Sequence, residues 1–482
     1  MNEKPEVDPC EVVQNEYGSQ EEIDERRSVE RALLRRLDLF IVPVFMVLQI
    51  ISYLDRGNIG FAATQGMAED IHLKGNQLNT VISVFYIFYI LAEFPAALVV
   101  KRLHFNRAIP TIAAGWGLIC LFTGFVQSFG SLVTTRILLG IFEGCLFPCM
   151  TLCLCSWYKR EELGVRVGYL IVASALAGAF GGLLAWAVLH LDGAANLPGW
   201  RWLYIVEGLV TVVWAGLCVV LIPRNYETAY FLNDEQKALM RTREKEMEAY
   251  SGGSGHYTTK DVREAAKDIK TWVHSVAQIA ILTVVYGFGT FLPIIIKEGF
   301  QFSTEQAQYL VIPVNLWGAL VCIIGAVLSD RYSARFLPLA ICAPFGIIGY
   351  AILLCDVSSG AQYFATYLIT TACFFCTGGN IAWLSVNCAP DGKRAGSLGI
   401  QLSLSNIGGV IAGQIYQSNA APAFTLGHAW SLGSLSVAWL AYWVTWMIYK
   451  RRQSFKDNLN DAEDVTTEEI YTDRAPDFKY HI

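Results

Sequence analysis

The sequence predicts an all-α membrane protein with twelve transmembrane helices arranged as two six-helix bundles. The first observation is composition: 54% of the 482 residues are hydrophobic and only 16% are charged, whereas soluble domains carry roughly 25% charged residues. The second is that the charges gather at both ends of the chain and in one central stretch, which leaves long apolar runs between them. The third is run length, because a helix needs roughly 20 apolar residues to cross a membrane.

Twelve apolar runs of this length can be located, in two groups of six separated by a polar segment. Each run is expected to form one transmembrane helix. The runs of the first group are 38–64, 80–99, 109–129, 132–155, 167–190 and 201–222, and those of the second are 272–296, 307–328, 336–355, 362–387, 397–416 and 429–449.

This pattern divides the chain into five parts. Residues 1–36 are acidic and polar, which predicts a disordered cytoplasmic N-terminal tail. Residues 37–222 and 271–450 are expected to form the two six-helix bundles. Residues 223–270 form a cytoplasmic linker with an amphipathic helix between them, and residues 451–482 form a second cytoplasmic tail.

The linker is the one sizeable polar segment inside the chain. Asp234–Tyr250 is rich in Glu, Lys, Arg, Met and Ala, which favours a helix. Ser251–Gly255 then predicts a flexible hinge, and Thr259–Lys270 a second short helix that leads into the seventh span. The linker is too small for a catalytic domain.

Lys and Arg residues are distributed unevenly between the two sets of short loops, and this asymmetry sets the orientation. It places both termini in the cytoplasm. On that side lie Arg35, Arg36, Lys101, Arg102, Arg107, Lys159, Arg160, Arg331, Arg335, Lys393, Arg394, Lys450, Arg451 and Arg452, whereas the outer side has only Lys74 and Lys297, with Arg201 at a membrane edge.

Several function classes are disfavoured by the sequence. The net charge of −6 and the acidic tails make nucleic acid an unexpected partner. Most of the 13 cysteines lie inside apolar runs without His or carboxylate neighbours, so we expect packing rather than a metal site. The sequence contains no nucleophile–base set and no phosphate-binding loop. We therefore expect no enzyme activity, no cofactor and no metal.

Five ionisable residues lie within the first four predicted spans. A charge inside a membrane span costs roughly 2.5–3.5 kcal/mol on insertion scales, so such residues are kept for a reason. The second half has neutral polar residues in its spans instead. The five are Asp55, Arg56, Glu93, Arg136 and Glu143, and the neutral residues are Asn315, Asn380, Asn387, Gln401 and Asn406.

Helix geometry predicts where these charges lie. At about 1.5 Å per residue, Arg56 and Arg136 both fall in the outer half of the membrane and Glu143 near its middle. Arg136 and Glu143 are two helical turns apart and share one face. Two guanidinium groups that face one cavity are suited to bind a carboxylate. The alternative is that the charges form structural pairs, either Asp55 with Arg136 or Arg56 with Glu143.

A short motif lies in the predicted inner loop between spans eight and nine. Asp330-Arg331 follows a span and Arg335 stands four residues later, with Ala326 upstream. This arrangement resembles the inner-loop motif G-x-x-x-D-R-x-G-R-R of the major facilitator superfamily, and it predicts a gating loop. The corresponding first-half loop has Lys101 at the acidic position.

Longer motifs occur in both halves of the chain. They are Tyr53-Leu-Asp-Arg-Gly-Asn-Ile-Gly60, Arg136-Ile-Leu-Leu-Gly-Ile-Phe-Glu-Gly144 with Pro148, Gly199-Trp-Arg-Trp-Leu-Tyr-Ile-Val-Glu-Gly208, Trp383-x3-Asn387, Lys393-Arg394, Asn406-Ile-Gly-Gly409 and Gln414-Ile-Tyr416. Over residues 35–450 the chain resembles the anion:cation symporter family of that superfamily, and in particular its fungal branch. That branch includes permeases for allantoate, nicotinate, pantothenate and biotin.

This resemblance implies a proton-coupled symporter that takes up a small organic carboxylate, such as a vitamin or a nitrogen compound, at the plasma membrane. It implies no cofactor, and we expect the protein to act as a monomer. The resemblance further implies the residue roles: Arg56 and Arg136 as carboxylate ligands, Asp55 and Glu143 as proton-linked carboxylates, and Tyr53 and Asn406 as residues that line the substrate cavity. Glu207 lies in a family signature, but the sequence assigns it no role.

The alternative function is a proton-coupled exporter of drugs or secondary metabolites. Such exporters usually carry a fifth-span motif that ends Gly-Pro-x-x-Gly-Gly, and here Ala177-Gly-Ala-Phe-Gly-Gly182 lacks the proline. This difference favours import. A nutrient receptor that does not transport is a third possibility, but the sequence has no cytoplasmic signalling domain.

Overall fold

The computed structural model describes residues 20–99, 104–250, 259–331, 335–417, 420–460, 473 and 478–481 of the chain. Within these ranges all regular structure is helical. Eleven helices in them are long and apolar enough to cross a membrane, and a shorter apolar segment at Gln77–Glu93 occupies the remaining position. The predicted all-α class is confirmed, and the twelve predicted crossings are consistent with this count.

The first bundle is formed by six long helices whose apolar residues match the predicted spans. Helix ends follow local capping: Ser128 precedes the fourth of these helices, and its hydroxyl accepts a hydrogen bond from the backbone N–H of Ser131. The six helices are α3 (Val42–Thr64), α5 (Gln77–Val99), α6 (Phe105–Thr123), α7 (Phe129–Trp157), α8 (Arg160–Leu189) and α9 (Gly199–Leu221).

The second bundle repeats this plan, with one crossing divided in two. That crossing breaks at Asn406, which separates α16 from α17. The helices of the second bundle are α12 (Ile269–Ile294), continued by the π-helical turn η4 (Ile295–Gly299), α13 (Thr304–Arg331), α14 (Phe336–Leu353), α15 (Ser359–Val386), α16 (Asp391–Ser405), α17 (Ile407–Ile415) and α18 (Thr425–Asn460).

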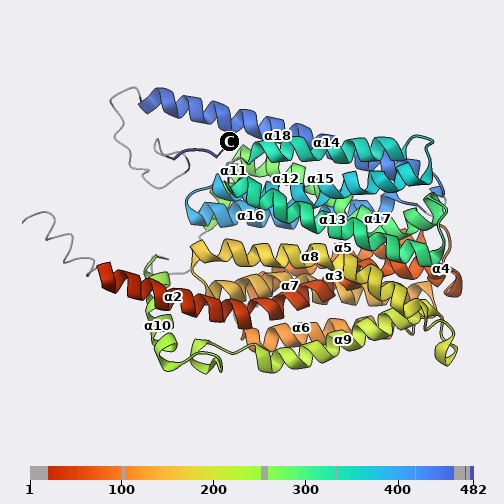
Figure 1. Cartoon of the computed structure of the whole chain (residues 1–482), viewed down its shortest axis with the longest axis horizontal. Helices are drawn as coiled ribbons and strands as arrows, with labels where there is room; N and C mark the ends of the chain where they lie inside the picture. The colour runs from red at the N-terminus through yellow and green to blue at the C-terminus, as the bar shows by residue number, and fades with distance from the viewer. Residues whose placement is uncertain are drawn as a thin grey trace, which may run out of the picture.

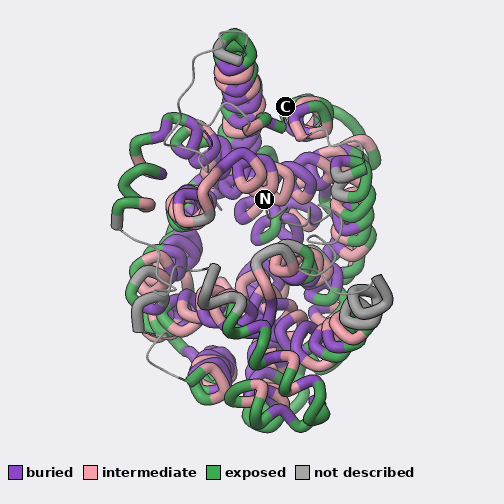
Figure 2. Tube along the Cα trace, turned by 90° about the vertical axis from the view of Figure 1, so that its left-hand side faces the viewer, coloured by how far each residue is buried: buried purple, intermediate pink, exposed green. Residues whose placement is uncertain are grey.

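The two bundles lie side by side with their helices nearly parallel (Figure 1). Most of the contact between them is formed by α3 with α12, α5 with α17, and α8 with α13. Buried residues face the interior, and exposed residues lie mainly around the periphery (Figure 2). Many of the exposed residues are large and apolar, such as Val213, Val219 and Val220 of α9. An apolar outer surface is what contact with lipid requires.

The N-terminal part of the chain requires a correction, because the predicted disordered tail is helical from residue 20 onward. Helix α2 (Gln20–Phe40) carries Leu33 and Leu37 on one face, and both are fully buried. The Arg36 guanidinium donates hydrogen bonds to the Phe231 carbonyl oxygen and to Gln236 Oε1, each at 3.1 Å. These long-range contacts offset the polar composition of the segment. Residues 1–19 lie outside the described ranges.

The linker contains the two helices α10 (Asp234–Tyr250) and α11 (Thr259–Lys267). The second helix is three residues shorter than predicted because Asp268 leaves the helical conformation and caps α12, accepting a hydrogen bond from the Lys270 N–H. The predicted hinge lies outside the described residues. Short elements occupy other connections: α4 (Met67–Asp70), η2 (Ala194–Asn196) and η3 (Tyr226–Thr228).

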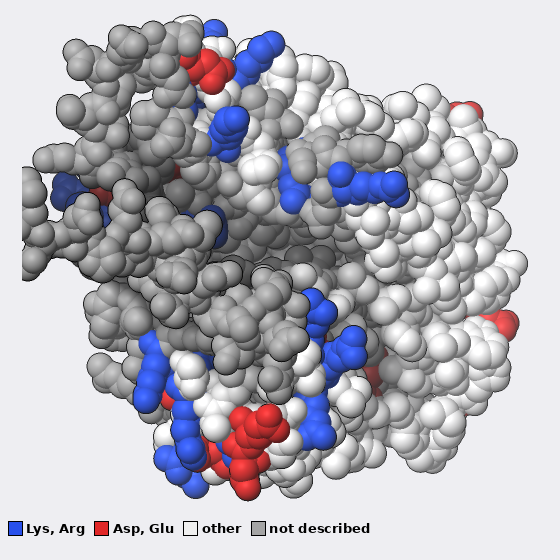
Figure 3. All heavy atoms as spheres, turned by 60° about the vertical axis from the view of Figure 1, so that its left-hand side comes forward, with Lys and Arg blue, Asp and Glu red and all other residues white. Residues whose placement is uncertain are grey.

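Basic side chains collect at one end of the molecule. Figure 3 shows Lys and Arg side chains gathered at the end from which α2 projects, beside a broad uncharged surface. Helices α10 and α11 and the C-terminal end of α18 lie at this same end (Figure 1). We call it the basic end, and the end that carries α4, η2 and η4 the opposite end.

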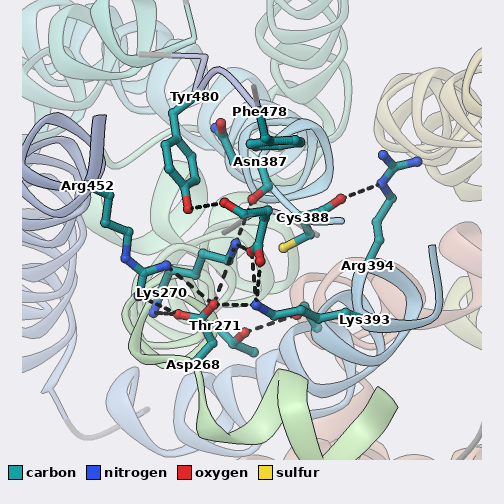
Figure 4. Close-up of polar contacts among 12 residues, drawn as sticks. Asp268, Lys270, Thr271, Asn387, Cys388, Lys393, Arg394, Arg452, Phe478 and Tyr480 are labelled. Carbon is teal, nitrogen blue, oxygen red and sulfur yellow. Dashed lines mark hydrogen bonds and ion pairs between the residues drawn. The ribbon is translucent and has the colours of Figure 1, made fainter. Parts of the chain in front are cut away.

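The described residues of the predicted C-terminal tail are packed against the rest of the protein. Asp473 is 1% exposed and forms ion pairs with Lys270 and with Lys393, the latter at 2.9 Å. The Trp383 indole N–H donates to the His481 carbonyl oxygen at 2.9 Å. Figure 4 shows the polar contacts around Lys270 and Lys393, near the starts of α12 and α16, and the Tyr480 ring faces Lys270. The segment therefore covers part of the basic end.

Candidate functional site

The central feature of the site is an ion pair between α3 and α7. Arg56 Nε donates to Glu143 Oε2 at 2.7 Å, and the Glu143 side chain is fully buried. The hydroxyl of Ser52, one turn before Arg56, also donates to this oxygen at 3.2 Å. Of the two structural pairings that the sequence left open, this one is present.

Aromatic rings surround the guanidinium of Arg56. Its Cζ lies 4.7 Å from the ring centroid of Tyr53 and 4.6 Å from that of Tyr89, so both rings contact it through cation–π interactions. The nitrogen Nη2 also donates to the Tyr89 hydroxyl at 3.3 Å. Within the described part of the chain, Glu143 Oε1 has no hydrogen-bond partner. The pair thus combines a planar cation, aromatic faces and one carboxylate oxygen that is free to accept a proton.

Asp55 points away from Arg56, because successive residues on a helix are rotated by about 100°. Its carboxylate accepts hydrogen bonds from Trp116 Nε1 at 2.7 Å and from Cys120 Sγ at 3.1 Å, both on α6. Asp55 is 1% exposed. The two neighbouring charges therefore belong to different environments, one inside the first bundle and one toward α5 and α7.

Arg136 lies on α7 and is 2% exposed. Its Nη2 donates to the Tyr204 hydroxyl on α9 at 2.7 Å, and its Nε has no partner within the described residues. The structure thus gives the two predicted carboxylate ligands different partners: Arg56 bonds to Glu143 and Arg136 to Tyr204. No ion pair joins Arg136 to Asp55 in the described part of the chain.

Asn406 lies where the two bundles meet. Its amide nitrogen donates to Glu93 Oε2 on α5 at 2.8 Å, and its amide oxygen accepts from the Tyr286 hydroxyl on α12 at 3.0 Å. The Tyr286 ring contacts the ring of Tyr86, with centroids 4.8 Å apart. Glu93, for which the sequence indicated no role, thus bonds across the interface.

Sequence reasoning did not single out the tyrosines at positions 86, 89, 204 and 286. Their signal was weak, since aromatic residues are common in apolar spans. A tyrosine inside a predicted span still carries a hydroxyl group, and a buried tyrosine hydroxyl usually forms a hydrogen bond. Such a residue is therefore a candidate neighbour for a buried charge.

Hydrogen bonds seal the contact between the bundles toward the opposite end. Lys297 Nζ donates to the Thr64 carbonyl oxygen at 2.6 Å, and Gln308 Nε2 donates to the Thr64 hydroxyl at 2.7 Å. Asn79 Nδ2 donates to the carbonyl oxygens of Gly413 and Tyr416, each at 2.7 Å. Among the described residues, no hydrogen bond joins the two bundles between the Glu93–Asn406 contact and the basic end. The two bundles are thus closed together at the opposite end.

The predicted gating loop is described only in part. Arg331 is exposed, and Arg335 Nη1 donates to the Ser329 hydroxyl at 3.1 Å. The side chain of Asp330 and the first-half position Lys101 lie outside the described residues. The gating role therefore stays a prediction.

One group of side chains has a composition that could hold a metal. Ligand atoms of Asp55, Cys120 and Glu207 lie within 4.8 Å of one another, and all three residues are buried. However, the Cys120 thiol donates to Asp55, and Asn58 Nδ2 donates to Glu207. Together with the bond from Trp116, these bonds occupy both oxygens of Asp55 and one oxygen of Glu207. The donor set therefore fits a hydrogen-bonded carboxyl cluster better than a metal centre.

Long apolar helices in two bundles, with buried charges beside the contact between the bundles, indicate a membrane transporter. The comparison of family models agrees, since the description Major Facilitator Superfamily matches residues 45–413. This chain belongs to the Major Facilitator Superfamily.

Individual relatives and solved structures are consistent with this assignment. The chain is 39% identical over 467 residues to an uncharacterized transporter of Schizosaccharomyces pombe, which covers 97% of this chain and 93% of the relative. It is 32% identical over 464 residues to the high-affinity nicotinic acid transporter of Saccharomyces cerevisiae. This match covers 94% of this chain and 85% of the yeast transporter. Its fold is similar to a crystal structure of a bacterial homologue of the human lysosomal transporter Spinster, inward-facing and unoccupied. The TM-score is 0.66 at 14% identity, over 84% of this chain and 96% of that one.

Proposed function

We propose that this protein is a proton-coupled symporter that takes up a small organic carboxylate, with nicotinate as the first candidate. The observation that carries this proposal is the buried pair of Arg56 and Glu143, 2.7 Å apart and flanked by Tyr53 and Tyr89. The guanidinium suits a carboxylate, and the rings suit an aromatic substrate such as a pyridine. The similarity to a nicotinic acid transporter supports the choice of substrate.

Competition for one guanidinium couples the substrate to the proton. When Glu143 is protonated it no longer pairs with Arg56, so the planar fork of Arg56 is free to bind the substrate carboxylate. When the substrate leaves, Glu143 loses its proton and pairs with Arg56 again. The pair seen here corresponds to this second condition. Proton and anion therefore enter together and leave together.

The remaining predicted ligands have supporting roles in this proposal. Asn406 and Tyr53 are assigned to the lining of the substrate cavity, because the Tyr53 ring contacts Arg56 and Asn406 bonds to Glu93 across the bundles. Arg136 bonds to Tyr204, so it becomes a second carboxylate ligand only if that bond is given up. Asp55 belongs to a separate proton-linked cluster. Movement of Asp330, Arg331 and Arg335 would accompany closure of the basic end.

We propose that the protein lies in the plasma membrane with both termini in the cytoplasm. The gathering of Lys and Arg at the basic end supports this orientation, since such residues are enriched in cytoplasmic loops. In that orientation the sealed opposite end faces outward. The arrangement in this structure is then one that releases substrate to the inside.

Uptake of labelled nicotinate tests the proposal. Cells that express the chain, compared with cells that carry an empty vector, should take up nicotinate faster at an outside pH near 5 than near 7.5, and a protonophore should abolish accumulation. Uphill uptake that persists without a proton gradient, or that requires sodium, would overturn proton coupling. Acid-stimulated efflux without uptake would indicate the exporter instead.

A further inference from the structure

A second pair of carboxyl groups lies inside the first bundle, on the side of α3 that faces away from Arg56. Asp55 and Glu207 are 1% and 3% exposed, and a carboxyl oxygen of each lies within 4.8 Å of the other. Asn58 Nδ2 donates to both, to Asp55 Oδ1 at 3.4 Å and to Glu207 Oε2. Where helices α3 and α9 pack together, each helix thus contributes one buried carboxyl group.

Neutral groups surround this pair. Trp116 and Cys120 on α6 donate to Asp55, and Asn58 on α3 donates to both acids. Within the described residues, neither acid forms an ion pair with Lys or Arg. The guanidinium of Arg136 on α7 bonds to Tyr204, so Arg136 acts on Asp55 only through its longer-range charge.

Two ionised carboxylates this close in a buried site would repel each other without a counter-ion to offset the lost hydration. A hydrogen bond between two carboxyl groups also exists only when one of them carries a proton. Glu207 Oε1 has no partner among the described residues, so a shared proton would satisfy an acceptor that is otherwise left open. Charge and hydrogen bonding lead to the same protonation.

We propose that Asp55 and Glu207 form a shared proton site, separate from the Arg56–Glu143 pair, and that Glu207 is a further residue of proton coupling. This inference rests on the proposed symport. The proton enters from the outer aqueous side and leaves to the inner side when the pair separates. Glu207 does not touch the substrate site, so it acts through Asp55 and α3, the helix that also carries Arg56.

Infrared spectroscopy of the purified protein in liposomes without substrate tests the shared proton directly. At neutral pH the wild type should show the carbonyl band of a protonated, buried carboxylic acid, which shifts in D2O. The band should be lost or displaced in Glu207→Gln and in Asp55→Asn. Glu69→Gln, which changes an exposed acid on α4, is the matched control and should leave it unchanged. A band that survives unaltered in both buried variants would overturn the shared site.

A transport assay separates failure of this inference from failure of the proposed function. If wild-type protein shows no acid-stimulated nicotinate uptake while the infrared band behaves as expected, the proposed symport fails and the proton site stands. If wild-type uptake is acid-stimulated and Glu207→Gln has the same pH profile, the coupling role of Glu207 fails. The expected result is a flattened pH profile in Glu207→Gln, with nicotinate exchange retained.

Discussion

The amide nitrogen of Asn406 donates a hydrogen bond to Glu93 Oε2 at 2.8 Å and so joins the two helical bundles close to the buried Arg56–Glu143 pair. This contact is formed by a residue at the break between α16 and α17 and by an acid on α5. Rocking of one bundle against the other must change its length. It is therefore a contact that a transport cycle breaks and remakes.

The first prediction is that Asn406 and Glu93 are energetically coupled. Asn406→Ala leaves a partly buried carboxylate without its donor, which typically costs about 1–3 kcal/mol. In a double-mutant cycle with Glu93→Gln, melting of the detergent-purified protein should give a coupling energy of about 0.5–3 kcal/mol.

Asn315→Ala is the matched control for this cycle, because the Asn315 amide nitrogen donates within its own helix, to the Val311 carbonyl oxygen. It should show no coupling to Glu93→Gln. Additive effects of Asn406→Ala and Glu93→Gln would contradict the prediction.

The second prediction concerns Arg56. Arg56→Lys keeps the charge but loses the planar fork that holds a carboxylate. Loss of such a charge-assisted contact typically costs about 1.5–3 kcal/mol, so the KM for nicotinate should rise at least about tenfold while the amount of protein at the membrane stays normal. Arg201→Lys, at an ion pair with Asp70 away from the Arg56–Glu143 pair, is the control. A normal KM in Arg56→Lys would remove Arg56 from the substrate site.

The third prediction separates coupling from binding. Glu143→Gln resembles the protonated form and cannot titrate, so Arg56 stays available to the substrate. The variant should exchange labelled for unlabelled nicotinate across a vesicle membrane, yet fail to concentrate nicotinate in response to a pH gradient. Concentrative uptake at the wild-type level would make Glu143 a structural residue and leave Asp55 as the candidate.

Much of the fold follows from the sequence because membrane helices are specified by the length of apolar runs. The pairing of charges does not follow in this way. Spacing along one helix places Arg136 and Glu143 on a shared face, but it does not determine which neighbouring helix each of the two side chains contacts. Arg136 meets Tyr204 on α9, whereas Glu143 meets Arg56 on α3.

Long-range contacts were equally hidden in the sequence. Asp473 reaches Lys270, which is 203 residues away, and a polar tail gives no local sign of such a contact. Leu33 and Leu37 of α2 are an intermediate case. Their spacing of four residues is a helix signal, whereas the polar composition of residues 1–36 as a whole predicts disorder.

The fourth prediction tests the seal between α3 and α12. A Cβ atom built on Gly60 would lie 1.9 Å from the Thr290 carbonyl oxygen, so only glycine permits this approach. Gly60→Ala should lower the free energy of unfolding by about 1–3 kcal/mol, and therefore also the melting temperature. It should also reduce nicotinate uptake. Gly57→Ala, whose Cβ would only touch Phe61 at 3.9 Å, should resemble the wild type in both measurements. Equal behaviour of the two variants would refute the close contact.

The fifth prediction is the pH dependence of stability at the basic end. Asp268 accepts hydrogen bonds from Arg452 Nη2 and from Lys393 Nζ, each at 2.8 Å. Burial alone would raise the pKa of Asp268. The hydrogen bonds from Arg452 and Lys393 and the nearby charge of Lys270 outweigh burial and hold that pKa well below its usual range.

A carboxylate with a lowered pKa stabilises the fold at every pH above its unfolded value of about 3.9. That stability is lost as the pH falls through the lower, folded value. Asp268 should therefore make no contribution to the pH dependence of the melting temperature between about pH 5 and 8. When the pH is lowered below about 4, the melting temperature should decrease. Asp268→Asn should melt lower at pH 7 and lose less on acidification. Asp457→Asn changes an exposed acid on α18 and is the control. If the melting temperature of Asp268→Asn fell on acidification as steeply as that of the wild type, the role of this carboxylate would be contradicted.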